Sequence, residues 1–337
     1  MSEHPVFSVV IPTYNRRERL VACLDSLARQ SLGVEKFEVI VVDDGSTDGT
    51  PEAVAEFRLK RHFRVSCHCR SSGGPGAARN YGASMAAGRI LAFTEDDIEV
   101  DAQWLEFAEK YFVDMKNPGI EGLTRLKNIS GSLRAFESPS ALGFLPCNLF
   151  VRKEVFEDVG GYDLRYFDLE RFLYFREDAD FGFRLLERGH TIARADDVKV
   201  VHPSQFSTPE EIYRHAQRYY FDPLLHRQHP ALFRRMIEAK KIGGVTFHRP
   251  MHYLCLTGVV SAILALGIEA LGGSEASSVF LVTFLLSVAG IGIKYWRSGS
   301  FRMGPVIPML AFIPLPFYYF YWFLRGCFRF RSFGALI

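Results

Sequence analysis

Short apolar runs that alternate with helix-forming stretches constrain the fold of this chain more than any other feature. Residues 7–11, 37–42 and 89–93 are dominated by apolar side chains, and each run has the length of a buried strand. Between the first two runs, leucines recur at helical spacing over residues 20–27. Strands that alternate with helices form a mostly parallel sheet with helices on both faces. The sequence therefore predicts an α/β domain with a Rossmann-like sheet.

Polar loops follow these strands directly, and an open sheet of this kind binds its ligands at such loops. The three loops cover residues 12–17, 43–50 and 94–99. The last loop contains Glu95, Asp96 and Asp97 in succession. Neighbouring like charges raise one another's pKa unless a cation compensates them, and oxygen ligands in a loop suit Mg²⁺ or Mn²⁺. Two interpretations stay open at this point: a metal site, or a solvated acidic turn.

Composition excludes some classes of protein. The 337 residues include 40 basic and 38 acidic side chains, for a net charge of +2, so the chain lacks the overall positive field typical of nucleic-acid binders. Its six cysteines include no CxxC pair, which favours a reduced, cytosol-facing catalytic part. The N-terminus has no basic start followed by an apolar stretch. We therefore expect no nucleic-acid partner and no cleavable signal peptide.

The character of the chain changes after residue 249, where long apolar segments begin. They lie at about residues 253–271, 278–295 and 305–324. The first two approach the roughly 20 residues that a membrane-spanning helix needs. Two buried core helices are the alternative, but such helices usually carry a polar face. We expect a catalytic domain at residues 1–249 and a membrane region at residues 250–337.

The third apolar segment is interrupted by Pro308, Pro314 and Pro316. A kinked span, a re-entrant segment and an interfacial segment all stay open for it. Basic residues cluster before the first segment and after the second, and basic residues favour the cytoplasmic side. The sequence therefore predicts a multi-pass protein of the cell (inner) membrane, with its catalytic domain facing the cytoplasm.

Two further motifs contain residue types found at nucleotide sites. The second predicted strand ends in Asp43 and Asp44, which are followed by glycine, serine and threonine. A glycine-rich loop at residues 73–76 leads into a helical stretch that contains Arg79. Backbone N–H groups at such a helix start, together with an arginine, can hold an anionic group. Each motif alone is equally typical of an ordinary turn or helix cap.

Taken together, these motifs resemble those of family 2 glycosyltransferases. Five segments occur in the order and spacing of that family: residues 12–15 (PTYN), 42–48 (VDDGSTD), 76–80 (GAARN), 93–97 (FTEDD) and 176–180 (REDAD). The resemblance covers roughly residues 5–205. It implies a GT-A fold, with a nucleotide-sugar donor bound across the first half of the sheet.

The resemblance also implies roles for the residues of the donor site. The predicted nucleotide-binding residues are Pro12, Thr13, Tyr14, Asp44, Arg79 and Asp96. Among them, Pro12 and Tyr14 would frame the nucleobase, Asp44 would accept from it, and Asp96 would contact the ribose or sugar. Asp97 is the predicted metal ligand. Glu95 is a second one, although the family usually has aspartate at that position.

On the acceptor side, the resemblance implies that Asp178 is the general base, supported by Glu177 and Asp180, with Asn148 in the acceptor region. A carboxylate within hydrogen-bond reach of the acceptor hydroxyl is what this chemistry needs. An alternative stays open, because Asp178, Asp180 and Arg184 have the spacing of ion pairs on a helix surface.

The predicted reaction is an inverting transfer of a sugar from a nucleotide diphosphate sugar to a hydroxyl acceptor, which we expect to be a lipid-linked or cell-envelope glycan. Processive members of the family usually carry a QxxRW motif, and residues 217–220 (QRYY) lack its tryptophan, so a non-processive enzyme is expected. Two alternatives remain. One is a nucleotidyltransferase with a similar metal site, and the other is an inactive membrane scaffold with the same fold.

Overall fold

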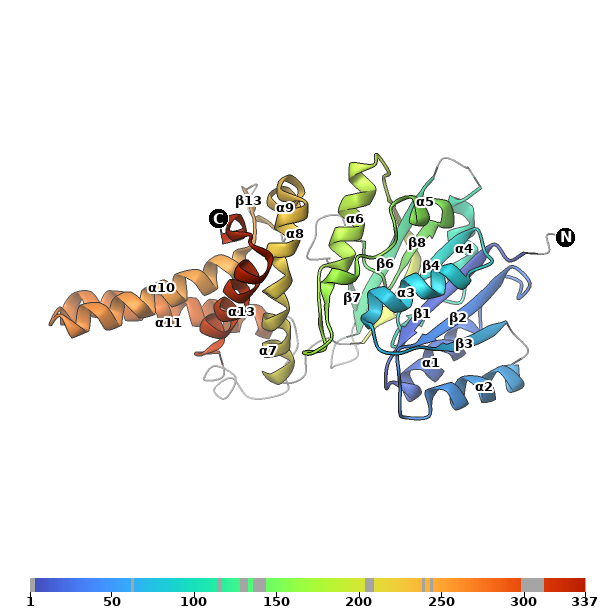
Figure 1. Ribbon diagram of the computed structural model, residues 1–337, viewed down its shortest axis with the longest axis horizontal. Coiled ribbons are helices and arrows are strands. Elements are labelled where there is room, and N and C mark those ends of the chain that lie inside the picture. The colour runs from blue at the N-terminus through green and yellow to red at the C-terminus, as the bar shows by residue number, and fades with distance from the viewer. Residues whose placement is uncertain are drawn as a thin grey trace. The chain divides into compact units, whose positions relative to one another are not determined.

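The computed structural model describes residues 4–61, 64–113, 117–127, 133–135, 144–203, 209–237, 240–242, 245–297 and 312–336. The described residues form two compact units (Figure 1). The first unit, which we call the catalytic unit, comprises the described residues up to 203. The second, the C-terminal unit, comprises those from 209 onward. Each unit is described by itself below.

The catalytic unit contains a nine-stranded sheet in the order β3-β2-β1-β4-β8-β6-β11-β5, with β7 paired to β6. Its strands are β1 (Phe7–Thr13), β2 (Phe37–Asp43), β3 (Val65–Cys69), β4 (Ile90–Phe93), β5 (Glu99–Val100), β6 (Gly119–Lys127), β7 (Leu133–Ala135), β8 (Leu149–Arg152) and β11 (Ala193–His202). The first four strands in this order pair in parallel, as the sequence predicts. Beyond β4 the sheet is mixed, because β8 runs antiparallel to both β4 and β6.

Helices cover both faces of the sheet because side chains along a strand point alternately to its two sides. They are α1 (Arg17–Leu27), α2 (Thr50–Arg61), α3 (Gly74–Met85), α4 (Trp104–Tyr111), α5 (Lys153–Asp158) and α6 (Glu177–Glu187). On β1, Val9 and Ile11 belong to the core that contains residues of α1, α2 and α4. Val10 points the other way, into the core formed with α3, α5 and α6. The α/β fold with helices on both faces is therefore confirmed.

Strand directions decide which loops share an edge. Two successive antiparallel pairings, β4 with β8 and β8 with β6, leave β6 parallel to β4. The strand β11 pairs in parallel with β6, so the carboxyl ends of β1, β4 and β11 lie at one edge of the sheet. The chain that leaves β4 pairs with the end of β11 as β5, in a register that sets Glu99 opposite Val201. This return brings the loop after β4 to the end of β11.

The C-terminal unit is mostly helical. Its elements are α7 (Pro209–Arg218), a 3₁₀ turn η2 (Tyr219–Phe221), α8 (Asp222–Gln228), α9 (Pro230–Met236), the antiparallel pair β12 (Lys240–Ile242) and β13 (Val245–Phe247), α10 (Pro250–Ala270), α11 (Ser274–Arg297), α13 (Leu315–Phe330) and η3 (Phe333–Leu336). The helices α10 and α11 form a long hairpin (Figure 1). Both are long and apolar enough to cross a membrane, and the mean hydropathy of an 18-residue window is 1.9 in α10 and 2.1 in α11.

The observed bounds sharpen the predicted segments. Predicted segments 253–271 and 278–295 correspond to α10 and α11. Of the predicted segment 305–324, residues 305–311 lie outside the described residues, and the described part belongs to α13, which begins at Leu315. The contacts divide the chain near residue 203 rather than at the predicted boundary of 249. The extent of a membrane region therefore stays a prediction.

Candidate active site

The acidic loop after β4 is fixed from both sides by hydrogen bonds. Thr94 is buried; its N–H donates to the carbonyl of Val10 at 3.2 Å, and its Oγ1 donates to the carbonyl of Cys147 at 3.1 Å. The Sγ of Cys23 donates to the carbonyl of Glu95 at 3.5 Å. These contacts set the direction in which the next three carboxylates project.

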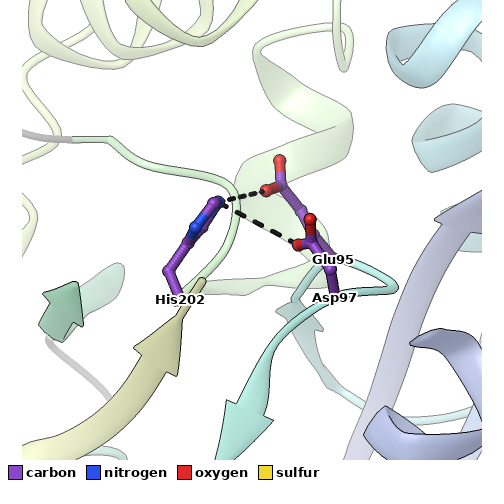
Figure 2. Close-up of side chains that lie close together, drawn as sticks. All are labelled: Glu95, Asp97 and His202. Carbon is purple, nitrogen blue, oxygen red and sulfur yellow. Dashed lines mark ion pairs between the residues drawn. The ribbon is translucent and has the colours of Figure 1, made fainter. Parts of the chain in front are cut away.

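Three side chains converge at the shared edge of the sheet: Glu95, Asp97 and His202. Figure 2 shows the imidazole of His202 pointing toward the two carboxylates. Its Nε2 lies 3.6 Å from Glu95 Oε2 and 4.0 Å from Asp97 Oδ1. The three potential ligand atoms all lie within 4.8 Å of one another. Within the part of the chain that the structure describes, this is the one group with the composition and spacing of a metal site.

The donor atoms of this group fit a divalent cation. Asp97 Oδ1 is buried and accepts no hydrogen bond from any described residue, although buried oxygens normally have a partner. The Nδ1 of His202 lies 2.7 Å from the carbonyl of Pro203, to which it can only donate. Its Nε2 is therefore the atom that faces the carboxylates. Two carboxylate oxygens and one imidazole nitrogen suit an ion such as Mn²⁺.

The charges of the group support one another. Burial opposes ionisation of Glu95, but His202 and Arg79 outweigh it and lower the pKa of Glu95 to about 2. Burial likewise opposes protonation of His202, but Glu95 and Asp97 raise the pKa of the imidazole to about 9. Positive charge between the two carboxylates is thus favoured. Without a cation the imidazolium of His202 supplies it, and a divalent cation bound there would displace the proton from Nε2.

Sequence reasoning found Glu95 and Asp97 but missed His202. This histidine is the last residue of β11, 105 residues after Asp97 in the chain. Its only sequence signal is its place as the first polar residue after the short apolar run of Val200 and Val201. The pairing of β5 with β11, which brings it to the acidic loop, leaves no pattern in the sequence.

Asp96 points away from the metal group and toward β1. Its Oδ2 accepts from Thr13 Oγ1 at 2.9 Å, and its Oδ1 accepts from Arg16 Nη1 at 2.9 Å. The same arginine atom lies 3.3 Å from Asp97 Oδ2. Burial raises the pKa of Asp96 to about 6 despite this arginine. The structure thus joins Thr13 to Asp96, two of the predicted donor-site residues, and adds Arg16.

Arg79 is buried beneath the acidic loop and connects two carboxylates. Its Nη2 donates to Glu95 Oε1 at 3.0 Å, and its Nη1 lies 3.6 Å from Glu177 Oε1. Its guanidinium also lies over the ring of Tyr162, 5.4 Å from the centroid. Arg79 therefore positions acidic side chains here, and the predicted nucleotide contact stays a prediction.

The carboxylate of Asp44 is likewise hydrogen-bonded to groups of the protein. Its carboxylate accepts from the N–H of Gly74 at 2.7 Å and from Arg70 Nη1 at 2.9 Å, and from the N–H of Gly73 at 3.1 Å. Gly74 has φ +82°, a conformation that favours glycine. Asp44 thus fixes the loop that enters α3, and its predicted contact with the nucleobase stays a prediction.

The remaining nucleobase residues stand at the end of β1. Pro12 is half-buried in the strand, whereas Tyr14 is 38% exposed in the loop that follows. The ring of Tyr14 faces the ring of Phe172, with centroids 4.8 Å apart.

The acceptor-side residues fall into different environments at the start of α6. Asp178 is half-buried, and its Oδ1 accepts from the N–H of Ala179 at 2.7 Å. Burial raises its pKa. Asp180 is fully buried and pairs with Arg184 at 2.7 Å, so the predicted alternative of an ion pair holds for this residue. Glu177 faces Arg79, as described above.

Asn148 is a buried residue of the turn directly before β8. It is fully buried, its Oδ1 accepts from Trp104 Nε1 at 2.8 Å, and its Nδ2 donates to the carbonyl of Val198 at 3.0 Å. These bonds tie β11 to α4. Its predicted place on the acceptor side stays a prediction.

Comparison with known proteins adds independent findings. Residues 8–160 match the family described as "Glycosyl transferase family 2". The chain is 32% identical over 213 residues to glycosyltransferase AglE of Haloferax volcanii, a match that covers 60% of this chain and 68% of AglE. It is 30% identical over 209 residues to the PGL/p-HBAD biosynthesis glycosyltransferase of Mycobacterium tuberculosis, with 60% of this chain and 78% of that protein covered.

A third relative shares only one region. The poly(ribitol-phosphate) beta-N-acetylglucosaminyltransferase TarS of Staphylococcus aureus is 37% identical over 125 residues, which cover 37% of this chain and 22% of TarS.

Among solved structures, the mannosyltransferase PcManGT from Pyrobaculum calidifontis, in complex with GDP-Man and Mn²⁺, is similar with a TM-score of 0.59 and 17% identity. That match covers 97% of this chain and 88% of PcManGT. It supports the GT-A fold.

Proposed function

The chain belongs to glycosyltransferase family 2, and on this premise we propose that it is an inverting enzyme that moves a sugar from a nucleotide diphosphate sugar to a hydroxyl acceptor with the help of Mg²⁺ or Mn²⁺. One observation carries the proposal. Arg79 contacts Glu95 of the metal group and also Glu177, the neighbour of Asp178 in α6. Arg79 thus links the metal group to the start of α6, the helix that carries the predicted base.

In the proposed reaction, Asp178 takes the proton of the acceptor hydroxyl as its oxygen attacks the anomeric carbon. The bond between that carbon and the diphosphate oxygen breaks, and its electron pair leaves with the nucleoside diphosphate. This single displacement inverts the configuration at the anomeric carbon. Burial raises the pKa of Asp178, which makes the carboxylate a better proton acceptor than an exposed aspartate.

Glu95, Asp97 and His202 would hold the cation. When bound, it would neutralise the charge that develops on the leaving diphosphate. PcManGT binds GDP-Man together with Mn²⁺, which supports a divalent cation for this chain as well. Arg16 and Thr13 keep Asp96 beside the same loop, where it would contact the ribose or sugar.

A further part of the proposal is that α10 and α11 lie in a lipid bilayer. Only 39% and 33% of the residues in the apolar windows of α10 and α11 are buried, whereas a core helix would be mostly buried. We propose that these two helices span the cell (inner) membrane, with the catalytic unit in the cytoplasm as the flanking basic residues favour. Such an anchor brings the enzyme to lipid-linked or cell-envelope glycans, which we propose as its acceptors.

The part of the third predicted segment that the structure describes favours the interfacial alternative. The helix α13 has 16 residues, about 24 Å of helix against a hydrocarbon core of about 30 Å. It exposes Phe317, Tyr321 and Phe328. Aromatic side chains are typical of the membrane interface.

A donor screen tests the proposal. The full-length protein in detergent is heated with Mn²⁺ and each of a panel of nucleotide diphosphate sugars. One donor is expected to raise the melting temperature, since a ligand at a hundredfold its Kd stabilises a protein by about 2.7 kcal/mol. Release of nucleoside diphosphate from that donor should then stop when EDTA removes the metal. Stabilisation by none of the donors would contradict the proposed function, and turnover that survives EDTA would contradict its metal dependence.

Membership of the family leaves the nucleotidyltransferase alternative without support. The inactive-scaffold alternative predicts donor binding without product, so the same assay separates it from the enzyme.

A further inference from the structure

An aromatic side chain stands at the donor end of the sheet in a strained and exposed position. Phe172 lies in the turn of a small antiparallel hairpin formed by β9 (Phe167–Asp168) and β10 (Leu173–Tyr174). Its φ is +49°, which is uncommon for a bulky residue without a functional or structural cause. Its side chain is 43% exposed. Core packing therefore does not explain why a phenylalanine occupies this place.

The partners of Phe172 indicate what the hairpin covers. Its ring faces Tyr14 at 4.8 Å between centroids, with an interplanar angle of 35°. It also meets Phe167 edge-on at 5.7 Å. Phe167 in turn occupies the space beside Gly74, where a Cβ would lie 2.5 Å from its ring. The hairpin thus extends from the loop after β1 to the glycine loop that Asp44 holds.

The turn is braced in a way that keeps Phe172 directed at Tyr14. Arg171 donates to the carboxylate of Asp168 through both its N–H, at 3.1 Å, and its Nη1, at 2.7 Å. The N–H of Phe172 donates to the carbonyl of Leu169 at 3.4 Å. Leu169 lies in the same turn and is 62% exposed. The turn therefore has two exposed apolar side chains, and Phe172 is the one whose ring faces Tyr14.

We propose that Phe172 is a donor-binding residue, and that the nucleobase stacks between its ring and that of Tyr14. This inference rests on the proposed function, in which Tyr14 frames the nucleobase. Two rings that sandwich a third planar group lie roughly 7 Å apart, twice a carbon contact distance of about 3.5 Å. The present separation is 4.8 Å. The two rings therefore have to separate by about 2 Å to admit the base.

The proposed stacking contact predicts different effects on the binding of the nucleobase and on the binding of the phosphates. Stacking acts only on the planar base, so it contributes to the affinity for a nucleoside diphosphate and not to that for pyrophosphate. Loss of one stacking surface typically weakens binding on the order of tenfold.

The test compares variants of the full-length protein in detergent with Mn²⁺. Equilibrium binding is measured for nucleoside diphosphates with each common base and for inorganic pyrophosphate. F172A is expected to weaken binding of the preferred nucleoside diphosphate by roughly tenfold and to leave pyrophosphate binding unchanged. F172Y should restore the affinity. F172L, which keeps apolar bulk in the turn, should resemble F172A, and its melting temperature shows whether the turn is intact.

Leu169→Ala is the matched control, because it removes an exposed apolar side chain from the same turn without touching the Tyr14 contact. It should bind both ligands like the wild type. Equal nucleoside diphosphate affinity in the wild type, F172A and F172L would overturn the proposal. A higher affinity in F172A would also overturn it, because Phe172 would then obstruct Tyr14 instead of helping it. If the wild type binds no nucleoside diphosphate at all, the proposed function itself fails.

Discussion

The two compact units differ in where their apolar and charged side chains lie. In the catalytic unit, the side chains of β4 are buried and apolar, and the buried carboxylates Asp43, Asp44 and Asp96 lie at the carboxyl edge of the sheet. In the C-terminal unit, leucines on the long helices face outward, such as Leu266 at 74% exposure and Leu286 at 67%. Buried charge is found there too, in the pair of Arg249 and Asp222 at 3.7 Å.

This difference is the one that the proposed membrane anchor predicts. A soluble domain rarely exposes a continuous apolar surface, but the hairpin of α10 and α11 does so along its length. The buried charges also differ in use. Arg249 and Asp222 are one positive and one negative group that tie the start of α10 to α8. Glu95 and Asp97 are two carboxylates beside one imidazole, and their ligand atoms have the spacing of a metal site.

The largest expected effect comes from the metal group. Asp97→Asn keeps the size of the side chain but removes a negative ligand of the proposed cation. A bound cation stabilises transition-state charge by several kcal/mol, so we expect its loss to lower turnover about a thousandfold. A small fall in the melting temperature is expected as well, because Asp97 Oδ2 lies 3.3 Å from Arg16 Nη1 and 3.5 Å from Arg19 Nη1, and both ion pairs weaken when the charge is lost. Turnover is measured as release of nucleoside diphosphate.

Glu99→Gln is the control for Asp97→Asn. Glu99 is exposed, lies two residues further along the chain and is outside the metal group. Its variant should keep wild-type turnover. Equal losses in both variants would mean that the loop, and not the metal ligand, is what matters.

The second-largest effect tests whether Asp178 acts in catalysis rather than in donor binding. Asp178→Asn should lower kcat by about 10²- to 10⁴-fold, the usual contribution of a general base, while the Kd for the donor stays the same. Glu187→Gln at the exposed end of the same helix should change neither quantity. Near wild-type turnover in Asp178→Asn, with the donor bound normally, would remove this residue from the mechanism.

One substitution made in both units tests the comparison directly. Leu266→Arg puts a charge on the exposed face of α10, where lipid contact makes it cost roughly 3 kcal/mol. Leu59→Arg makes the same change on α2 of the catalytic unit, at a leucine that is 80% exposed. We expect the first variant to lose membrane retention after an alkaline wash, and the second to keep it. Equal retention would show that α10 does not face lipid.

The smallest effect is a shift in the pH profile. The base acts when ionised, so activity is lost as the pH falls through the pKa of Asp178. Because burial raises that pKa, the loss should begin at a higher pH than for an ordinary aspartate, whose pKa is about 3.9. The acid limb of kcat/KM against pH measures it. An acid limb at or below the ordinary value would contradict a buried base.

The sequence alone indicated most residues of the site, but it did not show which protein groups the motif residues contact. Glu95 and Asp97 were predicted as ligands from acidic residues after an apolar strand, and both belong to the observed group. Arg79 and Asp44 were assigned to the nucleotide, yet each is held by protein partners. A motif fixes which residue types stand in a loop, whereas the partner of a buried charge depends on what folds against it.

By itself, the sequence determined the α/β class, the polar loops at the strand ends and the two long apolar helices, because these follow from local periodicity and hydropathy. Only the tertiary structure decided that His202 meets the acidic loop and that Phe172 covers Tyr14. The physical reason is that strand order and direction are set by packing between distant segments. The return of the chain as β5 alongside β11 joins residues that no local pattern connects.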